Sequence, residues 1–353
     1  MVQKKISYTL RGLILLDLLV LAHAFAAPQN EFADKIAFLR GGEVWVANPD
    51  GLSPQKLTSD SGRADEFFFS PTLKYLAYAK VIGSAEEPGL WDSTETPPQR
   101  AICSIVILDL GTKMTLKEMK PTHDPWIYID RWLPEDKLLY HGSDGFSVSG
   151  SYVYDLHKDT EFELPPSDDR LLGADYSPDG TLEAYVDYSG RGETFRCNLH
   201  LVHSRAKIDT ILASRKGTIS DQRISHDKNS IAFLEVEGIK GVYFDILWLY
   251  DRRNSACVSL YRGPAKPKSG GVNSLAWSFD DRYVGMFFPP EAIVLIVHHP
   301  AESVKIPGDN FCWAGNERII FNQGDDTYLY DLRTNSRTLL IEHARKPVFL
   351  HGW

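Results

Sequence analysis

The stretch that decides the fold is Ala174-Asp-Tyr-Ser-Pro-Asp-Gly-Thr-Leu-Glu-Ala-Tyr185. A short apolar strand runs into a Ser-Pro-Asp-Gly turn, and a second apolar strand follows at once. Pro and Gly favour such a turn because Pro presets its φ and Gly accepts the positive φ that tight turns need. The stretch therefore predicts an antiparallel hairpin.

The same pattern recurs along the chain. Clear copies are residues 67–78 and 274–285, and weaker copies are residues 129–140, 222–233 and 312–321. Equivalent turn positions lie between 36 and 63 residues apart. This spacing brackets the roughly 40–50 residues of a four-stranded propeller blade.

A second kind of hairpin follows each copy, in which an apolar strand ends in Asp or Asn before a short polar turn. Its copies are residues 43–51, 104–111, 151–156, 245–251 and 327–332, with looser copies at 198–203 and 293–298. The apolar runs are nearly continuous, as expected for strands buried on both faces. The repeats predict an all-β protein with seven units.

The two chain ends supply complementary halves of one unit. Lys35–Arg40 resembles the second strand of the repeat, and residues 346–353 resemble a first strand without a successor. Pairing them would close a ring and remove exposed sheet edges. We therefore predict a seven-bladed β-propeller over residues 27–353 as a single domain, with a six-bladed ring as the alternative.

The N-terminus predicts export. Lys4, Lys5 and Arg11 precede the apolar run 13–27, which contains Ala24-Phe-Ala26. This pattern is typical of a signal peptide over residues 1–26, which implies a periplasmic or secreted protein. An uncleaved anchor is the alternative, although the run is shorter than the roughly 20 residues that span a bilayer. No second long apolar run follows, so we expect no transmembrane segment in the mature chain.

Composition narrows the function classes. The 353 residues carry a net charge of -9, which argues against a general nucleic-acid binder. Cys103, Cys197, Cys257 and Cys312 permit one or two disulfides in an oxidising compartment, and buried free thiols are an equal alternative. No Cys-x-x-Cys pair is present, so a zinc site is not predicted. We also expect a monomer.

Residues 35–40, 43–51, 56–58, 69–71 and 75–79 together resemble the TolB-like repeat. They are similar also to the propeller portion of the dipeptidyl peptidase IV and prolyl oligopeptidase families. The resemblance implies a propeller over the mature chain, a fold whose members bind, scaffold or gate in unrelated systems. The sequence shows neither the α/β domain of TolB nor the catalytic domain and G-x-S-x-G motif of the peptidases, so neither specific activity is predicted.

Loops on a rigid ring are the expected place for binding. With the strands of each blade lettered a to d from the channel outward, the b-c and d-a connections share one side of the ring, here named the b-c/d-a face. We predict long b-c connections at residues 81–100, 141–150, 187–196 and 236–244. The first contains Glu86, Glu87, Trp91 and Asp92, an aromatic anchor in an acidic surround, or alternatively a solvated insertion.

The predicted d-a connections differ in charge around the ring. Early ones carry Asp65, Glu66, Asp124, Asp168 and Asp169, and later ones carry Lys216, Lys266, Lys268, Arg345 and Lys346. Such a field could orient a dipolar partner, although Arg63 and Arg170 reduce the contrast and ordinary surface charge is the alternative. Trp126 is predicted either as a second anchor or as a core residue.

We therefore predict an exported, non-catalytic module that binds a protein or small ligand through the b-c/d-a face, without cofactor, metal or catalytic residues. The alternative is an enzyme acting on carbohydrate or peptide at the channel mouth. Histidine pairs at 200 and 203, 298 and 299, and 343 and 351 resemble the metal ligands of oligogalacturonate lyases, but their spacing and missing partners do not support that site. His141, Ser143 and Asp144 share a loop, which does not make a catalytic triad.

Overall fold

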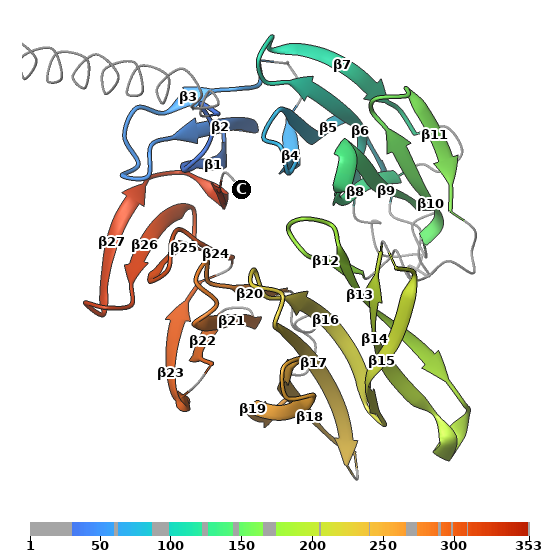
Figure 1. Cartoon of the computed structure of the whole chain (residues 1–353). Coiled ribbons are helices and arrows are strands. Elements are labelled where there is room, and N and C mark those ends of the chain that lie inside the picture. Colours follow the sequence, from blue (N-terminus) through green and yellow to red (C-terminus); the bar gives the residue numbers. More distant parts are fainter. Residues whose placement is uncertain are drawn as a thin grey trace, which may run out of the picture.

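A computed structural model describes residues 30–59, 63–86, 99–121, 126–143, 148–164, 174–204, 206–239, 241–265, 274–288, 291–297, 299–308 and 310–351. Within these residues, 28 strands form seven four-stranded antiparallel sheets, which are arranged as blades around a ring (Figure 1). The seven-bladed, all-β prediction is confirmed, and the six-bladed alternative is wrong. The described helices are two single 3-10 turns, η1 (Pro134–Asp136) and η3 (Gly192–Thr194).

Each blade is given from its inner to its outer strand. Blade 1 is β28 (Arg345–Leu350), β1 (Lys35–Arg40), β2 (Glu43–Ala47) and β3 (Gln55–Lys56); blade 2 is β4 (Ala64–Phe69), β5 (Tyr75–Glu86), β6 (Gln99–Asp109) and β7 (Met114–Met119). Blade 3 is β8 (Trp126–Leu133), β9 (Lys137–Ser143), β10 (Val148–Asp155) and β11 (Thr160–Glu163); blade 4 is β12 (Asp175–Tyr176), β13 (Leu182–Ser189), β14 (Arg196–His203) and β15 (Ile208–Arg215). Blade 5 is β16 (Thr218–Ile224), β17 (Ser230–Ile239), β18 (Val242–Asp251) and β19 (Ala256–Pro264). Blade 6 is β20 (Ser274–Trp277), β21 (Tyr283–Phe288), β22 (Glu291–Ile296) and β23 (His299–Pro307); blade 7 is β24 (Phe311–Trp313), β25 (Arg318–Gln323), β26 (Asp326–Asp331) and β27 (Ser336–Ile341).

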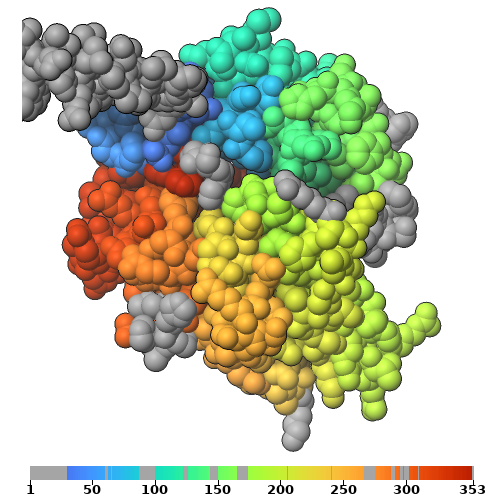
Figure 2. Space-filling model, viewed as in Figure 1, coloured from blue at the N-terminus to red at the C-terminus, as the bar shows by residue number. Residues whose placement is uncertain are grey.

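Blade 1 closes the ring from both chain ends, as predicted. Lys35 pairs with Leu350 and Ile36 with Phe349 in the antiparallel ladder between β1 and β28. Figure 2 shows the first and last described segments, in blue and red, packed side by side. Closure gives blade 1 a complete set of four strands and pairs the inner edge of β1 with β28.

A buried serine explains why the Ser-Pro turn recurs. Ser177 Oγ accepts a hydrogen bond from the backbone N–H of Leu182 at 2.9 Å and donates one to Asp179 Oδ1 at 2.8 Å. Equivalent bonds to the N–H five residues on are made by Ser70, Ser225 and Ser278. The hydroxyl thus satisfies a backbone donor that the tight turn would otherwise leave buried and unpaired.

The core lies between neighbouring blades. Ile36 and Phe38 of blade 1 pack with Ile320 of blade 7, and the other interfaces are filled by similar clusters. Three tryptophans at the end of an inner strand also tie one blade to the preceding one. Their indole N–H groups donate to backbone carbonyls: Trp132 to Phe68 at 2.9 Å, Trp277 to Arg223 at 3.0 Å, and Trp313 to Ala276 at 3.1 Å.

The b-c connections are shorter than the sequence predicts, because their hairpins continue as strand. β17 and β18 pair as far as Ile239 and Val242, within the predicted connection 236–244. β5 and β6 likewise pair as far as Glu86 and Gln99. The sequence hides these extensions because their outward side chains are polar or mixed, so no continuous apolar run marks them.

All four cysteines are free thiols in the structure, and Cys103 and Cys197 are buried while Cys257 and Cys312 are half-buried, so the structure favours free thiols over disulfides. Burial raises the pKa of the Cys312 thiol to about 12, and burial also raises the pKa of Cys197. Of the described helices, none has the length and apolar character needed to cross a membrane.

Candidate functional site

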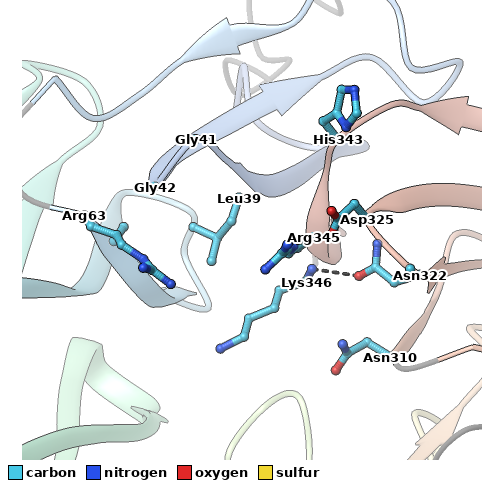
Figure 3. Close-up of a pocket in the computed structure, with 12 residues that line it drawn as sticks. Leu39, Gly41, Gly42, Arg63, Asn310, Asn322, Asp325, His343, Arg345 and Lys346 are labelled. Carbon is cyan, nitrogen blue, oxygen red and sulfur yellow. Dashed lines mark hydrogen bonds and ion pairs between the residues drawn. The ribbon is translucent and has the colours of Figure 1, made fainter. Parts of the chain in front are cut away.

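The b-c/d-a face carries a cavity of about 870 Å³, here called the mouth cavity, where blades 7, 1 and 2 meet. Its walls come from the turn between β1 and β2, the start of β4, the turn between β25 and β26, and the start of β28 (Figure 3). Gly42 lies in the first of these turns with a φ of +80°, and a Cβ there would be 3.0 Å from Arg63 Cγ. Glycine therefore permits the close approach of Arg63 to blade 1.

The inner strand β28 is distorted at this cavity. Its pairing with β1 shifts register between Ala37 and Leu39, so that Lys346 and Pro347 form a bulge. Lys346 has a φ of +50° and His343, just before the strand, a φ of +51°. A non-glycine residue in such a conformation costs about 1–3 kcal/mol, so the surrounding structure has to hold it in place. Bulges of this type redirect side chains next to binding sites.

A buried amide holds the distorted segment in place. Asn322 is 2% exposed, and its Oδ1 accepts a hydrogen bond from the backbone N–H of Lys346 at 2.8 Å. Its Nδ2 donates to the carbonyl of Ala344 at 2.7 Å, and Thr327 Oγ1 donates to the same carbonyl at 2.8 Å. The N–H of His343 donates to Asp326 Oδ1 at 3.0 Å. Blade 7 thus fixes the backbone from which Arg345 and Lys346 extend.

The charged side chains that line the mouth cavity are mainly basic. Figure 3 shows Arg63 reaching into the cavity from one side, and Arg345 and Lys346 from the other. Asp325 forms an ion pair with Arg345. Arg63 has no ion pair or side-chain hydrogen bond with any residue that the structure describes. The arrangement can accept a negatively charged group.

A second feature of this face is a set of exposed apolar side chains on the b-c hairpins of blades 2, 4 and 5. The exposed fraction is 46% for Ile82, 60% for Tyr188, 42% for Ile239, 53% for Val242 and 60% for Tyr243. Tyr188 stacks on Phe195 across its hairpin, with ring centroids 5.9 Å apart. Exposed apolar groups also lie on outer strands, as at Met114 and Phe162, but the two most exposed tyrosines both lie at these hairpin tips.

The opposite mouth of the channel holds a cavity of about 730 Å³ with a different character. Its arginines are occupied within the chain: Arg131 Nε lies 3.2 Å from Asp130 Oδ2, and Arg223 Nη2 lies 2.8 Å from Asp221 Oδ1. Phe279 lies over this side and stacks on His351 at 4.2 Å. The fixed ion pairs leave less free charge for a ligand here than the mouth cavity offers.

His200 and His141 are held in polar contacts with other side chains. His200 Nδ1 lies 2.9 Å from Asp209 Oδ1, and its Nε2 lies 3.3 Å from Asp187 Oδ2. No set of three or more His, Cys, Asp or Glu side chains among the described residues is placed to hold a metal. His141 contacts Ser151 and Asp130, with Nδ1 2.9 Å from Ser151 Oγ and Nε2 3.4 Å from Asp130 Oδ2, and Asp144 lies outside the described residues. Ser151 is 8% exposed, so this chain of contacts is a buried network.

The predicted site residues fall into three groups. Lys346 lines the mouth cavity, Glu86 is exposed at the end of β5, and Glu66 is half-buried in β4. Trp126 is 6% exposed and has the Arg100 guanidinium 5.3 Å from a ring centroid, as its core alternative predicts. For Asp65, the structure describes the backbone alone. The remaining predicted residues lie outside the described residues: Glu87, Trp91, Asp92, Asp124, Asp168, Asp169 and Lys268.

The sequence did not point to Asn322, and it did not show that Arg63 lies near Arg345 and Lys346. In the sequence, Arg63 belongs to an early d-a connection, where its positive charge reduces the net negative charge of the neighbouring acidic residues. Ring closure instead places it beside Arg345 and Lys346 at the same cavity. The signals for the exposed tips were Tyr188 and Tyr243, which lie within the predicted b-c connections 187–196 and 236–244, where an aromatic residue has no core to enter.

No protein-family model and no curated protein matches the sequence. Among solved structures, TolB from Acinetobacter baumannii is 16% identical with a TM-score of 0.45, and the match covers 94% of this chain and 70% of that one. The tricorn protease is 10% identical with a TM-score of 0.52, covering 90% of this chain and 34% of that chain. An oligogalacturonate lyase in complex with manganese is 11% identical with a TM-score of 0.49, covering 87% and 84%. These likenesses concern the fold, and at that level the predicted TolB-like resemblance is confirmed.

Proposed function

We propose that the chain is an exported, non-catalytic binding module that engages a protein partner through its b-c/d-a face. The observation that carries the proposal is the exposure of Tyr188, Tyr243 and their apolar neighbours at the tips of the b-c hairpins. Aromatic side chains are the usual anchors of protein interfaces because they bury a large area at little cost in side-chain entropy. The ring supplies a rigid base, so little order has to be gained on binding.

The predicted loop around Trp91 lies between β5 and β6 in the sequence, and we propose that it contributes to the same face. Trp91 and its acidic neighbours Glu86, Glu87 and Asp92 would extend the contact surface of blade 2. Export is supported by the signal-peptide pattern in residues 1–26. The intact mass of the protein isolated from its host tests export, since cleavage after Ala26 would remove these residues.

Photo-crosslinking in host cells tests the contact face. We would replace Tyr243, and separately Tyr188, by p-benzoylphenylalanine, which preserves an aromatic ring at each hairpin tip. The matched controls carry the same group at Phe162 on the outer strand β11, which is 50% exposed, and at Leu52 near the outer turn of blade 1, which is 63% exposed. We expect one specific adduct from the hairpin tips and none from the controls.

Two results would overturn the proposal. Equal adducts from all four positions would mean that contact is not confined to the b-c/d-a face. The lack of any adduct at both tyrosines would favour the alternative, an enzyme acting on carbohydrate or peptide at the channel mouth.

A further inference from the structure

We propose that the mouth cavity binds a small, multiply charged oxyanion, whose charge is carried by several carboxylates or by a phosphate group. This inference rests on the b-c/d-a face being the binding face, and it adds a second ligand of stated chemistry. The cavity lies at the junction of blades 7, 1 and 2 and has a volume of about 870 Å³, which suits a small molecule.

The first argument is charge. Three cationic side chains, Arg63, Arg345 and Lys346, extend into the cavity from two blades (Figure 3). The carboxylate that lines it, Asp325, is already paired with Arg345. Like charges brought together repel one another, and a bound anion relieves that repulsion. The concentration of positive charge is notable in a chain whose net charge is -9.

The second argument is the state of Arg63. Among the described residues it has no ion pair and no side-chain hydrogen bond, although it lies against a glycine turn that leaves room for it. A guanidinium presents five N–H donors in a planar fork that matches the two oxygens of a carboxylate or phosphate. Arg63 is therefore available to bind an oxyanion with two parallel hydrogen bonds.

The third argument is preorganisation. Lys346 and His343 both have a positive φ, and buried Asn322 and Thr327 hold the segment between them. The fold thus maintains a strained bulge that places two cations at the cavity, where a regular strand would alternate their directions. At the opposite mouth both arginines that line the cavity, Arg131 and Arg223, are paired with Asp130 and Asp221, whereas Arg63 has no such partner among the described residues.

Calorimetric titration of the purified protein with citrate and with inorganic pyrophosphate, at low ionic strength, tests this inference. Sodium chloride of matched ionic strength is the blank. The variants Arg63→Gln and Lys346→Gln remove one charge each from opposite sides of the cavity. Arg333→Gln removes an exposed arginine from the outer turn of blade 7, on the other face, and is the matched control.

We expect the unmodified protein and Arg333→Gln to bind at least one probe equally well. Each cavity variant should bind at least tenfold more weakly, with a thermal unfolding curve that shows it is folded. Binding of citrate alone would assign a polycarboxylate, and binding of pyrophosphate alone would assign a phosphate ligand. Because the two cavity variants alter different blades, one remains informative if the other does not fold.

The inference is overturned if neither probe binds at millimolar concentration, or if all three variants lose affinity equally. Its failure is distinct from failure of the proposed function. A specific adduct at Tyr243 without anion binding would remove only the ligand proposed here. Anion binding without an adduct would remove only the protein partner.

Discussion

Lys113 closes the outer turn of blade 2 with a backbone φ of +57°, a conformation that favours glycine. The same turn position is left-handed in other blades, at Asp159, Lys207, Ser255 and Asn335. We expect Lys113→Gly to raise the free energy of unfolding by about 0.5–1 kcal/mol, because glycine removes the steric cost of the left-handed residue. Denaturation with urea measures the change, and Lys113→Ala should give almost none. A loss of stability in the glycine variant would contradict this explanation.

Single residues also explain why the turns are recognisable in the sequence. Asp331 ends β26, and its Oδ1 accepts hydrogen bonds from the N–H groups of Arg333 and Thr334, both at 3.0 Å. Asp109 does the same for Thr112 at 2.8 Å. The Asp that follows each apolar strand is thus required locally, which is why the pattern survives in divergent copies.

The elements are joined by a tryptophan at the end of an inner strand. Trp277 is 6% exposed, and its indole N–H donates to the carbonyl of Arg223 in the preceding blade. We expect Trp277→Phe to lower the free energy of unfolding by about 1–3 kcal/mol, since it removes a hydrogen bond and leaves a void between blades. Trp45→Phe is the control, because Trp45 is half-buried and donates to Arg40 within its own blade. Equal losses of unfolding free energy in the two variants would show that the hydrogen bond between blades stabilises the fold no more than one within a blade.

The whole molecule depends on closure by β28, which pairs with β1 and also packs on blade 7. Removal of residues 345–353 would leave the inner edge of β1 unpaired and expose Ile36 and Phe38. We expect the shortened chain to lose cooperative thermal unfolding and to aggregate. A circular permutant is the control, with residue 351 linked to residue 30 and new ends between Arg253 and Asn254. It keeps every blade complete, and the two ends of the described chain lie close together, since Asp34 N is 2.6 Å from Leu350 O. A shortened chain as stable as the permutant would contradict a closing role for β28.

The sequence by itself determined the fold, because the fold is built from local signals repeated seven times. The Ser-Pro-Asp-Gly turn at Ser177 and the Asp that ends each apolar strand act within a few residues, so they can be read in order along the chain. Closure of the ring could also be predicted, because residues 35–40 and 346–353 each match one strand of the repeated unit. Export and binding to a partner were also predicted from the sequence, and both stay predictions.

The tertiary structure alone brought together the residues of the proposed anion site. Arg63 and Lys346 lie near opposite ends of the chain, and only closure of the ring brings them to one cavity. The bulge at Lys346 depends on Asn322, a residue that looks like any strand asparagine until blade 7 packs against β28. A binding site is made by contacts between distant residues, and no local pattern records them, whereas a repeat is made by contacts between near ones.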